Sequence, residues 1–393
     1  MSIQTKTNTA LLQAIDEAGG GNGMLARTRI LLVGHYMWPW YEEACAEALE
    51  SHDCVVERFE WLDDFRHWVA GRSEPVYHSL SHRIQYRLRF GPVVWKINQR
   101  LVEVAERVKP DIVWFYNVHL ISPATVKRLR GMLPRATFCQ YTNDDPFSTA
   151  AKPLLWRNYL ASIRYFDMHF AFRHSNIAEY HRYGSTNVEL LRAYFIPEVD
   201  HPEPLDAIPD RFKCDVVFAG HYEDDGRVEI LEAICEAGFN LRLYGGGWDA
   251  ALPNLRTDSP LRVQFPVSPA TGADYRYAIC GAKVALCFLS TLNHDTYTRR
   301  SFQIPAMKTA MLSQYTDDLV TLFKPDEEAM FFRNQTELLE KLRLLIDDSA
   351  LSYSIAEAGY RRVYADGHDV RARMGVWLKE TLQWRANNIS ERA

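Results

Sequence analysis

The sequence predicts an α/β protein with two doubly wound parallel sheets, one in each half of the chain. Short apolar segments alternate with helical patterns in the first half, and the alternation restarts after a proline-rich break at residues 197–213. The strand-like segments are apolar throughout, which is typical of parallel strands covered by helices on both faces. A chain of 393 residues is long enough for two such domains.

The first half supplies four expected strands, separated by helical patterns. One expected helix, at 122–133, begins with Ser122 and Pro123, a favourable pair for an N-cap and a first helical turn. Another expected helix covers 93–109. The strands expected in this half are 29–34, 111–118, 137–141 and 168–173.

The second half repeats the pattern. Asn334 and Glu337 resemble a capping box at the start of one helix, with Asn in place of the usual Ser or Thr. The strands expected in this half are 214–220, 240–245, 284–289 and 309–314. The helices expected in this half are 227–238, 301–308, 336–348 and a helical stretch over 351–384.

These segments divide the chain into domains. Residues 1–28 are expected to form a flexible tail, because GGGNG at 19–23 interrupts the chain before the first strand. One doubly wound α/β domain is expected at 29–205 and a second at 206–365. Ligands of doubly wound sheets bind at the carboxyl ends of the strands. We therefore expect the functional site in the cleft between the two domains.

Composition and charge argue against several classes of protein. The net charge of −5 does not favour a nucleic-acid-binding protein. No apolar stretch approaches the ~20 residues of a membrane-spanning helix, and the N-terminus lacks the apolar centre of a secretory signal. The seven cysteines are scattered without a C-x-x-C pair, so neither a zinc site nor a disulfide framework is expected. We expect a cytoplasmic protein.

A glycine-bearing turn follows the first expected strand of the second half. The sequence DVVFAG runs directly into HYEDDGR, which opens a helix. Gly220, the start of the helix and Arg227 together would provide a seat for an anion. The same residues would equally suit an ordinary strand-to-helix turn.

The next expected strand ends in YGGGW at 244–248. Tyr244, Gly245 and Gly246 would allow a ligand to press against the backbone, with Trp248 as a flat wall. A flexible loop is the alternative interpretation.

A third candidate segment is DTYTRRSFQIPAMKTAML at 295–312. Arg299 and Arg300 lie between Asp295 and Gln303, and Ser301 is a candidate helix cap. Two guanidinium groups beside a helix start would suit an anionic ligand. The alternative is a solvated basic loop.

These segments, with IAEAGYRRV further on, resemble the CgeB-like branch of the GT-B glycosyltransferases, loosely of the group 1 retaining type. The resemblance extends over about 212–375 and is weak over the first half. It implies two facing Rossmann-like domains, with a nucleotide-sugar donor on the second and an acceptor on the first. It also implies that no metal is tightly held, and that a last helix, at 366–393, crosses back onto the first domain.

This sequence departs from the family at an informative position. Many relatives carry two acidic residues eight apart, the second of which contacts the nucleotide ribose, whereas here the pair is Asp295 and Gln303. An amide can hydrogen-bond two hydroxyls but carries no charge. The resemblance thus implies donor binding for Gln303 and a role near the transferred sugar for Asp295. Lys308 and Thr309 stand where relatives often have a glycine.

Candidate acceptor-side residues follow strands of the first half. His35 follows the strand at 29–34 and is a candidate base or acceptor contact. Asp144 and Asp145 follow another strand, and either would accept a proton from an acceptor hydroxyl or orient the sugar. His119 is a further candidate. For each residue, a structural hydrogen bond or an Asx turn is the alternative.

Residues 58–100 are basic and aromatic, with eight Lys or Arg and three His. Such a segment would suit peripheral contact with the inner face of an anionic membrane, or a phosphate-bearing acceptor. The alternative is a helical surface whose basic side chains lie over the domain.

The sequence and the resemblance together predict a glycosyltransferase that uses a nucleotide-diphosphate sugar and needs no cofactor. The expected acceptor is a hydroxyl of a bacterial surface glycan, a lipid-linked glycan or a polypeptide. Arg227, Arg299 and Arg300 would neutralise the departing diphosphate without a metal. One alternative is a catalytically lapsed GT-B protein acting as a nucleotide-sugar-binding or scaffold subunit. Less favoured alternatives are a nucleic-acid-binding protein and a phosphorylase-like enzyme.

Overall fold

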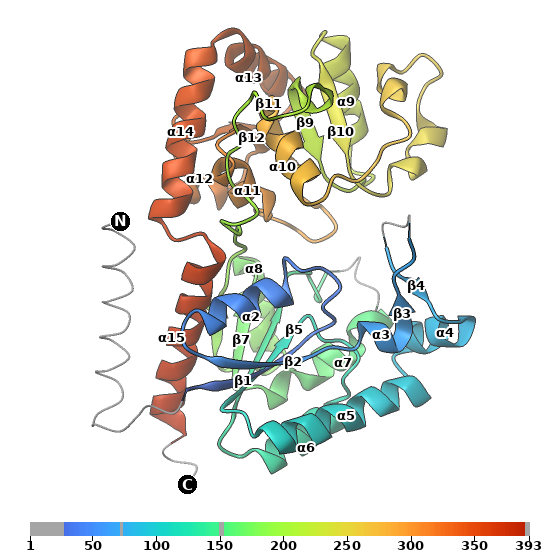
Figure 1. Ribbon diagram of the computed structural model, residues 1–393, viewed down its shortest axis with the longest axis vertical. Helices are drawn as coiled ribbons and strands as arrows, with labels where there is room; N and C mark the ends of the chain where they lie inside the picture. Colours follow the sequence, from blue (N-terminus) through green and yellow to red (C-terminus); the bar gives the residue numbers. More distant parts are fainter. Residues whose placement is uncertain (1–26, 71–73, 149–152, 390–393) are drawn as a thin grey trace. The chain divides into compact units, whose positions relative to one another are not determined.

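The computed structural model describes residues 27–70, 74–148 and 153–389, which form two compact units (Figure 1). Unit 1 comprises the described residues up to Arg192 together with those from Arg371 onward, and unit 2 is Ala193–Val370. The expected tail lies outside the described residues, apart from its last two positions.

Unit 1 is built on a sheet of six parallel strands in the order β2–β1–β5–β6–β7–β8. Val33 of β1 lies opposite Phe115 of β5, so the two strands end at the same edge of the sheet. In spatial order the strands are β2 (Val55–Phe59), β1 (Arg29–Val33), β5 (Ile112–Tyr116), β6 (Thr137–Thr142), β7 (Met168–Ala171) and β8 (Val188–Leu190).

Helices cover both faces of this sheet, which is why its central strands are apolar throughout. Leu31 and Val33 point into a core shared with two helices, whereas Trp114 faces another helix at the opposite side. The helices are α2 (Glu42–Glu50), α3 (Leu62–Phe65), α4 (Leu80–Leu88), α5 (Pro92–Val108), α6 (Pro123–Met132), α7 (Pro153–Ser162), α8 (His174–Arg182) and α15 (Val370–Asn388). A short antiparallel pair, β3 (Arg66–His67) and β4 (Val76–Tyr77), precedes α4.

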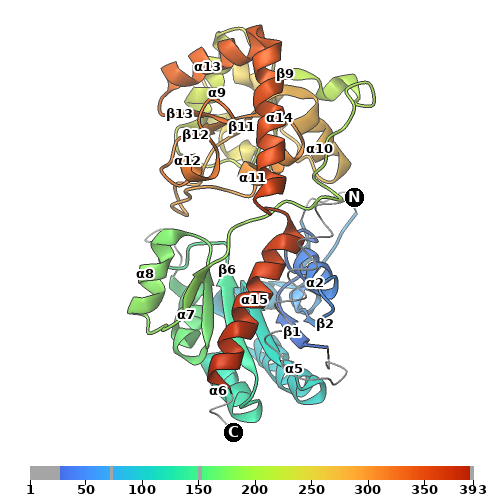
Figure 2. The same ribbon diagram turned by 90° about the vertical axis from the view of Figure 1, so that its left-hand side faces the viewer.

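Helix α15 brings the chain back to unit 1 and lies across its sheet (Figure 2). The ring of Trp377 stacks on that of Trp114 at 4.4 Å between centroids, and both side chains are fully buried. Further along, Arg385 Nη1 donates to the carbonyl of Asp111 at 2.7 Å. The implied crossover helix is thus confirmed.

Unit 2 contains a sheet of five parallel strands in the order β10–β9–β11–β12–β13. Its strands are β10 (Leu241–Tyr244), β9 (Cys214–Ala219), β11 (Ala282–Cys287), β12 (Ala310–Gln314) and β13 (Met330–Phe332). Its helices are α9 (Arg227–Glu236), α10 (Ala273–Cys280), α11 (Arg300–Ala306), α12 (Leu319–Leu322), α13 (Gln335–Asp347) and α14 (Ser349–Ala365). The predicted fold class, α/β with two doubly wound parallel sheets, is confirmed.

Both predicted N-caps are present. The Ser122 hydroxyl accepts a hydrogen bond from the Thr125 N–H at 3.1 Å, and Asn334 Oδ1 accepts one from the Glu337 N–H at 3.0 Å. Each cap satisfies an N–H group that the first helical turn leaves unpaired.

The structure differs from the sequence-based expectation at two boundaries. Residues 193–205, expected in the first domain, belong to unit 2, where Glu203 forms an ion pair with Arg276 at 2.6 Å. The helical stretch over 351–384 is interrupted, because Gly367 adopts a left-handed φ of 63° between α14 and α15. A left-handed residue of this kind is a common helix terminator. Strands β2, β3, β4, β8 and β13 were not expected.

Candidate functional site

The strand order places a ligand-binding position in each sheet. In both units the second strand along the chain lies outside the first, and the third lies on the other side of the first. The connections therefore diverge between β1 and β5 in unit 1, and between β9 and β11 in unit 2. In doubly wound sheets, ligands bind at the carboxyl ends of the strands beside such a switch point.

In unit 2, two glycines meet at the carboxyl ends of β9 and β10. The Gly220 N–H donates to the Tyr244 carbonyl at 2.9 Å. A Cβ atom on Gly245 would lie only 1.9 Å from the Gly220 oxygen, and Gly245 has a φ of 139°. Only glycine satisfies both the close approach and this backbone conformation. The close approach at Gly245 is thus between the backbones of the two turns, and the contact of a ligand with these glycines stays a prediction.

Arg300 lies at the switch point of unit 2. Its Nη2 donates to the Phe288 carbonyl, just beyond β11, at 3.2 Å, and its Nη1 is 3.2 Å from the position of a Cβ on Gly220. The guanidinium thus spans the ends of β9 and β11. It is only half-buried, and no carboxylate of the described residues forms an ion pair with it. Its remaining donors suit a phosphate, for which a guanidinium is well shaped.

Arg227 is placed differently from expectation. Its Nε and Nη2 donate to the two carboxylate oxygens of Asp225 at 2.7 and 2.6 Å, and its Nη1 donates to the His221 carbonyl. The side chain is 3% exposed. Asp225 already balances its charge, so Arg227 holds the β9–α9 turn together instead of offering an open anion seat.

Trp248 is also placed differently, because it belongs to the core of unit 2 and is 1% exposed. Its indole N–H donates to the Gly220 carbonyl at 3.0 Å, and its ring packs against Phe218. Trp248 therefore stabilises the glycine turns from within the core, and its buried ring is not available for stacking against a ligand. Tyr244 and Gly246 remain at the edge, where Gly246 accepts a hydrogen bond from Tyr222 N–H at 3.0 Å and burial raises the pKa of Tyr244.

Ser301 does not cap α11. The helix begins at Arg300, Arg299 holds the N-cap position, and Ser301 is fully buried with its hydroxyl accepting from the Thr298 N–H at 3.1 Å. A serine near the start of an expected helix indicated an N-cap, but the Ser301 side chain is buried in the core.

Gln303 is held by a residue that sequence reasoning missed. Its Nε2 donates to Asp200 Oδ1 at 2.8 Å, and its Oε1 accepts from the Tyr275 hydroxyl at 3.2 Å. Asp200 is 1% exposed, and its Oδ2 also accepts from Ile196 N–H and lies 3.5 Å from Arg299 Nη2. The Gln303 amide thus faces a buried carboxylate, to which a neutral N–H donor is suited. Asp200 lies within the proline-rich segment at 197–213 that was expected to be a linker, and no local signal marks it.

Asp295 lies in the loop that follows β11 and is half-buried. Its backbone N–H donates to the Ser290 carbonyl at 2.9 Å. The Ser290 hydroxyl donates in turn to Glu223 of the β9–α9 turn at 3.0 Å. The loop of Asp295 is therefore tied to the turn beside Gly220, at the same edge of the sheet.

In unit 1, His35 follows β1 at the corresponding switch point. Its backbone N–H donates to Glu42 Oε1 at 3.1 Å, and its ring Nδ1 accepts from the Met37 N–H at 3.0 Å. The ring proton is consequently on Nε2, so His35 presents a hydrogen-bond donor and is placed as a contact, not as a base. Glu42 is fully buried, and burial raises the pKa of its carboxyl.

The structure separates the two neighbouring aspartates after β6. Asp145 is buried and accepts hydrogen bonds from the Phe147 N–H and the Asn176 amide, both at 3.0 Å. Asp144 is more exposed and accepts a long bond, 3.4 Å, from the Asn117 amide. Burial raises the pKa of Asp144, against the opposing effect of Asn117 and of nearby positive charge. Asp144 is the better placed proton acceptor of the two.

His119 is a structural residue. Its Nε2 lies 3.2 Å from the Tyr86 hydroxyl, and burial holds the pKa of the ring well below its ordinary value. Near it, a cavity of about 40 Å³ is lined by His35, Met37, Trp61, Leu62, Phe65, Arg66 and Tyr86. This volume is little more than that of one water molecule.

Across the described part of the chain, His, Cys, Asp and Glu side chains form no group that could hold a metal ion. The helices of the same residues include none that is long and apolar enough to span a bilayer.

Two comparisons place this architecture in a class. Residues 227–379 match the model of a family described as glycosyl transferase-like. Two Rossmann-like units with a returning C-terminal helix are the GT-B fold, and the solved structures that resemble this chain share it. The family match and the fold together support glycosyl transfer. No curated protein matches the sequence.

Three solved structures illustrate the likeness. Sucrose-phosphate synthase from Thermosynechococcus elongatus has a TM-score of 0.65 at 13% identity, covering 91% of this chain and 100% of that chain. HepE from Anabaena, in complex with UDP and glucose, has a TM-score of 0.61 at 12% identity with the same coverage. Trehalose-6-phosphate synthase from Burkholderia multivorans has a TM-score of 0.61 at 11% identity, covering 94% of this chain and 99% of that chain. At such identities the likeness shows the fold alone.

Proposed function

We propose that this protein transfers a sugar from a nucleotide-diphosphate sugar, bound by unit 2, to a hydroxyl acceptor. One observation carries the proposal: the Arg300 guanidinium, which forms no ion pair with a carboxylate of the described residues, spans the ends of β9 and β11 beside the glycine turns. Similar folds have been solved with UDP and glucose or with a UDP-sugar analogue, which supports a nucleotide-sugar donor here.

The proposed reaction leaves additional negative charge on the departing nucleotide diphosphate. The bond from the anomeric carbon to the phosphate oxygen breaks, the acceptor oxygen bonds to that carbon, and the hydroxyl proton passes to a base. Arg300 stabilises the negative charge that develops on the leaving diphosphate. Asp295, tied to the same edge, orients the sugar or stabilises positive charge at the anomeric carbon. We further propose that no metal is required.

Acceptor chemistry is assigned to unit 1. Asp144 takes the hydroxyl proton, because its raised pKa makes its carboxylate a stronger base than an ordinary aspartate. His35 Nε2–H holds an acceptor oxygen. We place the acceptor among bacterial surface glycans, lipid-linked glycans and glycoproteins, and the chain in the CgeB-like branch.

The decisive experiment compares nucleotide binding by two arginine variants. In Arg300→Ala, binding of UDP should weaken by about tenfold to 150-fold while binding of uridine changes little, because a charge-assisted bond is worth ~1.5–3 kcal/mol. Arg343→Ala is the matched control, since Arg343 is an exposed arginine on α13 of the same unit. Calorimetry with both ligands measures the difference. Equal weakening of both ligands, or UDP binding like that of the control, would refute the assignment.

A second candidate is a catalytically lapsed GT-B protein that binds nucleotide sugars without turnover. Gln303 favours this candidate. Its amide already forms hydrogen bonds with Asp200 and Tyr275, and it carries no charge with which to bind a ribose. Release of UDP from UDP-glucose, with or without an added acceptor, separates the candidates. Binding without any release supports the lapsed protein.

A further inference from the structure

Exposed apolar side chains are concentrated on one part of unit 1. Of the eighteen large hydrophobic residues that are exposed in the described chain, seven lie between residues 68 and 95. Phe90 is 76% exposed, Leu80 70% and Trp95 66%. We define the α4 face as Trp68, Val69, Leu80, Ile84, Leu88, Phe90 and Trp95.

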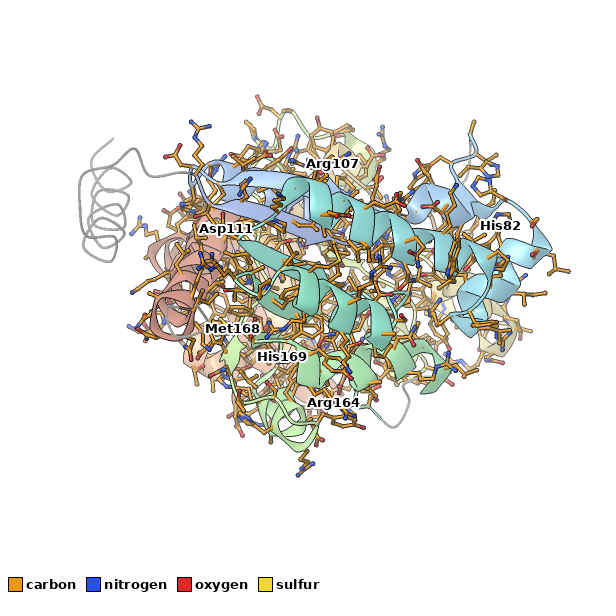
Figure 3. The ribbon with its side chains drawn as sticks, turned by 90° about the horizontal axis from the view of Figure 1, so that it is seen from below. His82, Arg107, Asp111, Arg164, Met168 and His169 are labelled. Atoms are coloured by element: carbon orange, nitrogen blue, oxygen red, sulfur yellow. The ribbon has the colours of Figure 1, made fainter. Side chains whose placement is uncertain are left out.

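The apolar residues of α4 form an outward stripe. Leu80, Ile84 and Leu88 stand four residues apart, so they share one side of the helix, and α4 has no buried residue at all. Tyr86, on another side, packs its ring against Phe65 at 5.2 Å. Tyr86 therefore packs against the core, whereas the stripe of Leu80, Ile84 and Leu88 is exposed to solvent. In Figure 3, where His82 marks the helix, α4 lies at the rim of unit 1.

Positive charge accompanies this stripe. Arg83 and Arg87 are exposed and stand one position before Ile84 and Leu88, and exposed Lys96 follows Trp95. None of the three forms an ion pair with a carboxylate in the described part of the chain. Between residues 66 and 100 the chain carries seven Lys or Arg and one Asp or Glu, although its net charge is −5.

We propose that the α4 face docks onto the surface of an anionic phospholipid bilayer. Helices that lie in a membrane interface combine an apolar side with Lys or Arg, and aromatic rings are enriched at that depth. The apolar residues enter the boundary between headgroups and acyl chains, while Arg83, Arg87 and Lys96 contact lipid phosphates. Charge complementarity selects this occupant. A second copy would bring an equally positive face against the first.

The α4 face adjoins the candidate acceptor site of unit 1. The ring of Trp68 contacts that of Trp38 at 5.8 Å, and Trp38 lies in the loop that carries His35. Docking would therefore bring the His35 loop close to the lipid surface, which suits a lipid-linked acceptor. This last step rests on the proposed function, whereas the docking itself does not.

Vesicle sedimentation tests the docking. The full chain should sediment with vesicles of phosphatidylglycerol and phosphatidylcholine and remain in solution with phosphatidylcholine alone. L80S/I84S/L88S should reduce the affinity for these vesicles at least tenfold. R83Q/R87Q should reduce this affinity about tenfold to thirtyfold and lower its dependence on salt. L205S/V263S is the matched control, because Leu205 and Val263 are exposed apolar residues of unit 2; its binding should equal that of the wild type.

Several results would overturn the proposal. These are no sedimentation of the wild type with either vesicle, equal sedimentation with both, or wild-type binding by L80S/I84S/L88S. Sedimentation velocity on the same proteins tests for self-association. If the wild type forms a dimer and L80S/I84S/L88S does not, the α4 face is an interface with a second copy of the chain instead. Thermal stabilisation by UDP, measured on every variant, reports on unit 2, so loss of docking and failure of the donor proposal are distinguishable.

Discussion

Replacement of Gln303 by glutamate should destabilise unit 2. The structure pairs Gln303 Nε2 with the buried Asp200 carboxylate at 2.8 Å, and a hydrogen bond to a charged group is worth ~1.5–3 kcal/mol. Gln303→Glu removes this bond and places a second carboxyl beside the first. Two full charges about 3 Å apart repel by roughly 5 kcal/mol at an effective dielectric constant of 20, which the introduced carboxyl avoids by binding a proton. We expect a loss of about 3 kcal/mol at pH 7.

Thermal unfolding monitors this loss. For a unit of this size, about 3 kcal/mol corresponds to a fall in Tm of roughly 6–12 °C. The pKa of the introduced carboxyl is raised in the folded state, so the deficit is largest at pH 8 and diminishes as the pH falls toward its unfolded value of about 4.3. The difference in Tm from the wild type should therefore be smaller at pH 5 than at pH 8.

The double variant D200N/Q303E provides the control. An asparagine at 200 can accept from the Ile196 N–H through its oxygen and donate to the introduced carboxylate through its nitrogen. The double variant should regain much of the Tm that Q303E loses, and its deficit should no longer grow with pH. A double variant no more stable than Q303E, or a Q303E protein of wild-type Tm at pH 8, would refute the pairing.

Four further predictions concern the site. Gly245→Ala should lower the stability of unit 2 by more than ~3 kcal/mol, because its Cβ would overlap the Gly220 oxygen; Gly131→Ala, with no atom within 4 Å of its Cβ, should be neutral in the same melting assay. Asp295→Asn should reduce turnover by ~10²-fold with UDP affinity within a few-fold, as initial rates and calorimetry will show. Asp144→Asn should slow transfer, and the acidic limb of the wild-type rate profile should lie above the ordinary aspartate range, because burial raises the pKa of Asp144. EDTA should leave UDP release from UDP-glucose unchanged, and loss restored by Mn²⁺ would contradict metal independence.

Local patterns predicted the elements that position the site. Apolar segments at 29–34, 111–118 and 214–220 became buried central strands, because parallel strands covered on both faces need apolar side chains throughout. Ser122 and Asn334 became N-caps, because a cap bonds to an N–H two or three residues away. Such signals act within a few residues of one another, so the sequence alone is sufficient to read them.

The partner that each side chain takes in the folded chain accounts for what the sequence did not predict, whether that partner is two residues away or far along the chain. Arg227 and Arg300 look alike as arginines near helix starts, yet the former is neutralised by Asp225 and the latter spans two strand ends. Trp248 follows three glycines that are typical of a loop, so an exposed ring was expected. Its ring is instead buried in the core of unit 2.

The sequence by itself determined the two parallel sheets and the glycine turns, because strand burial and turn geometry depend on neighbouring residues. Only the tertiary structure decided that Gln303 faces Asp200, 103 residues away, and that the stripe of α4 remains in solvent. Both depend on which surfaces the folded chain brings together. No local pattern encodes that choice, since an apolar residue on a helix looks the same whether or not another element covers it.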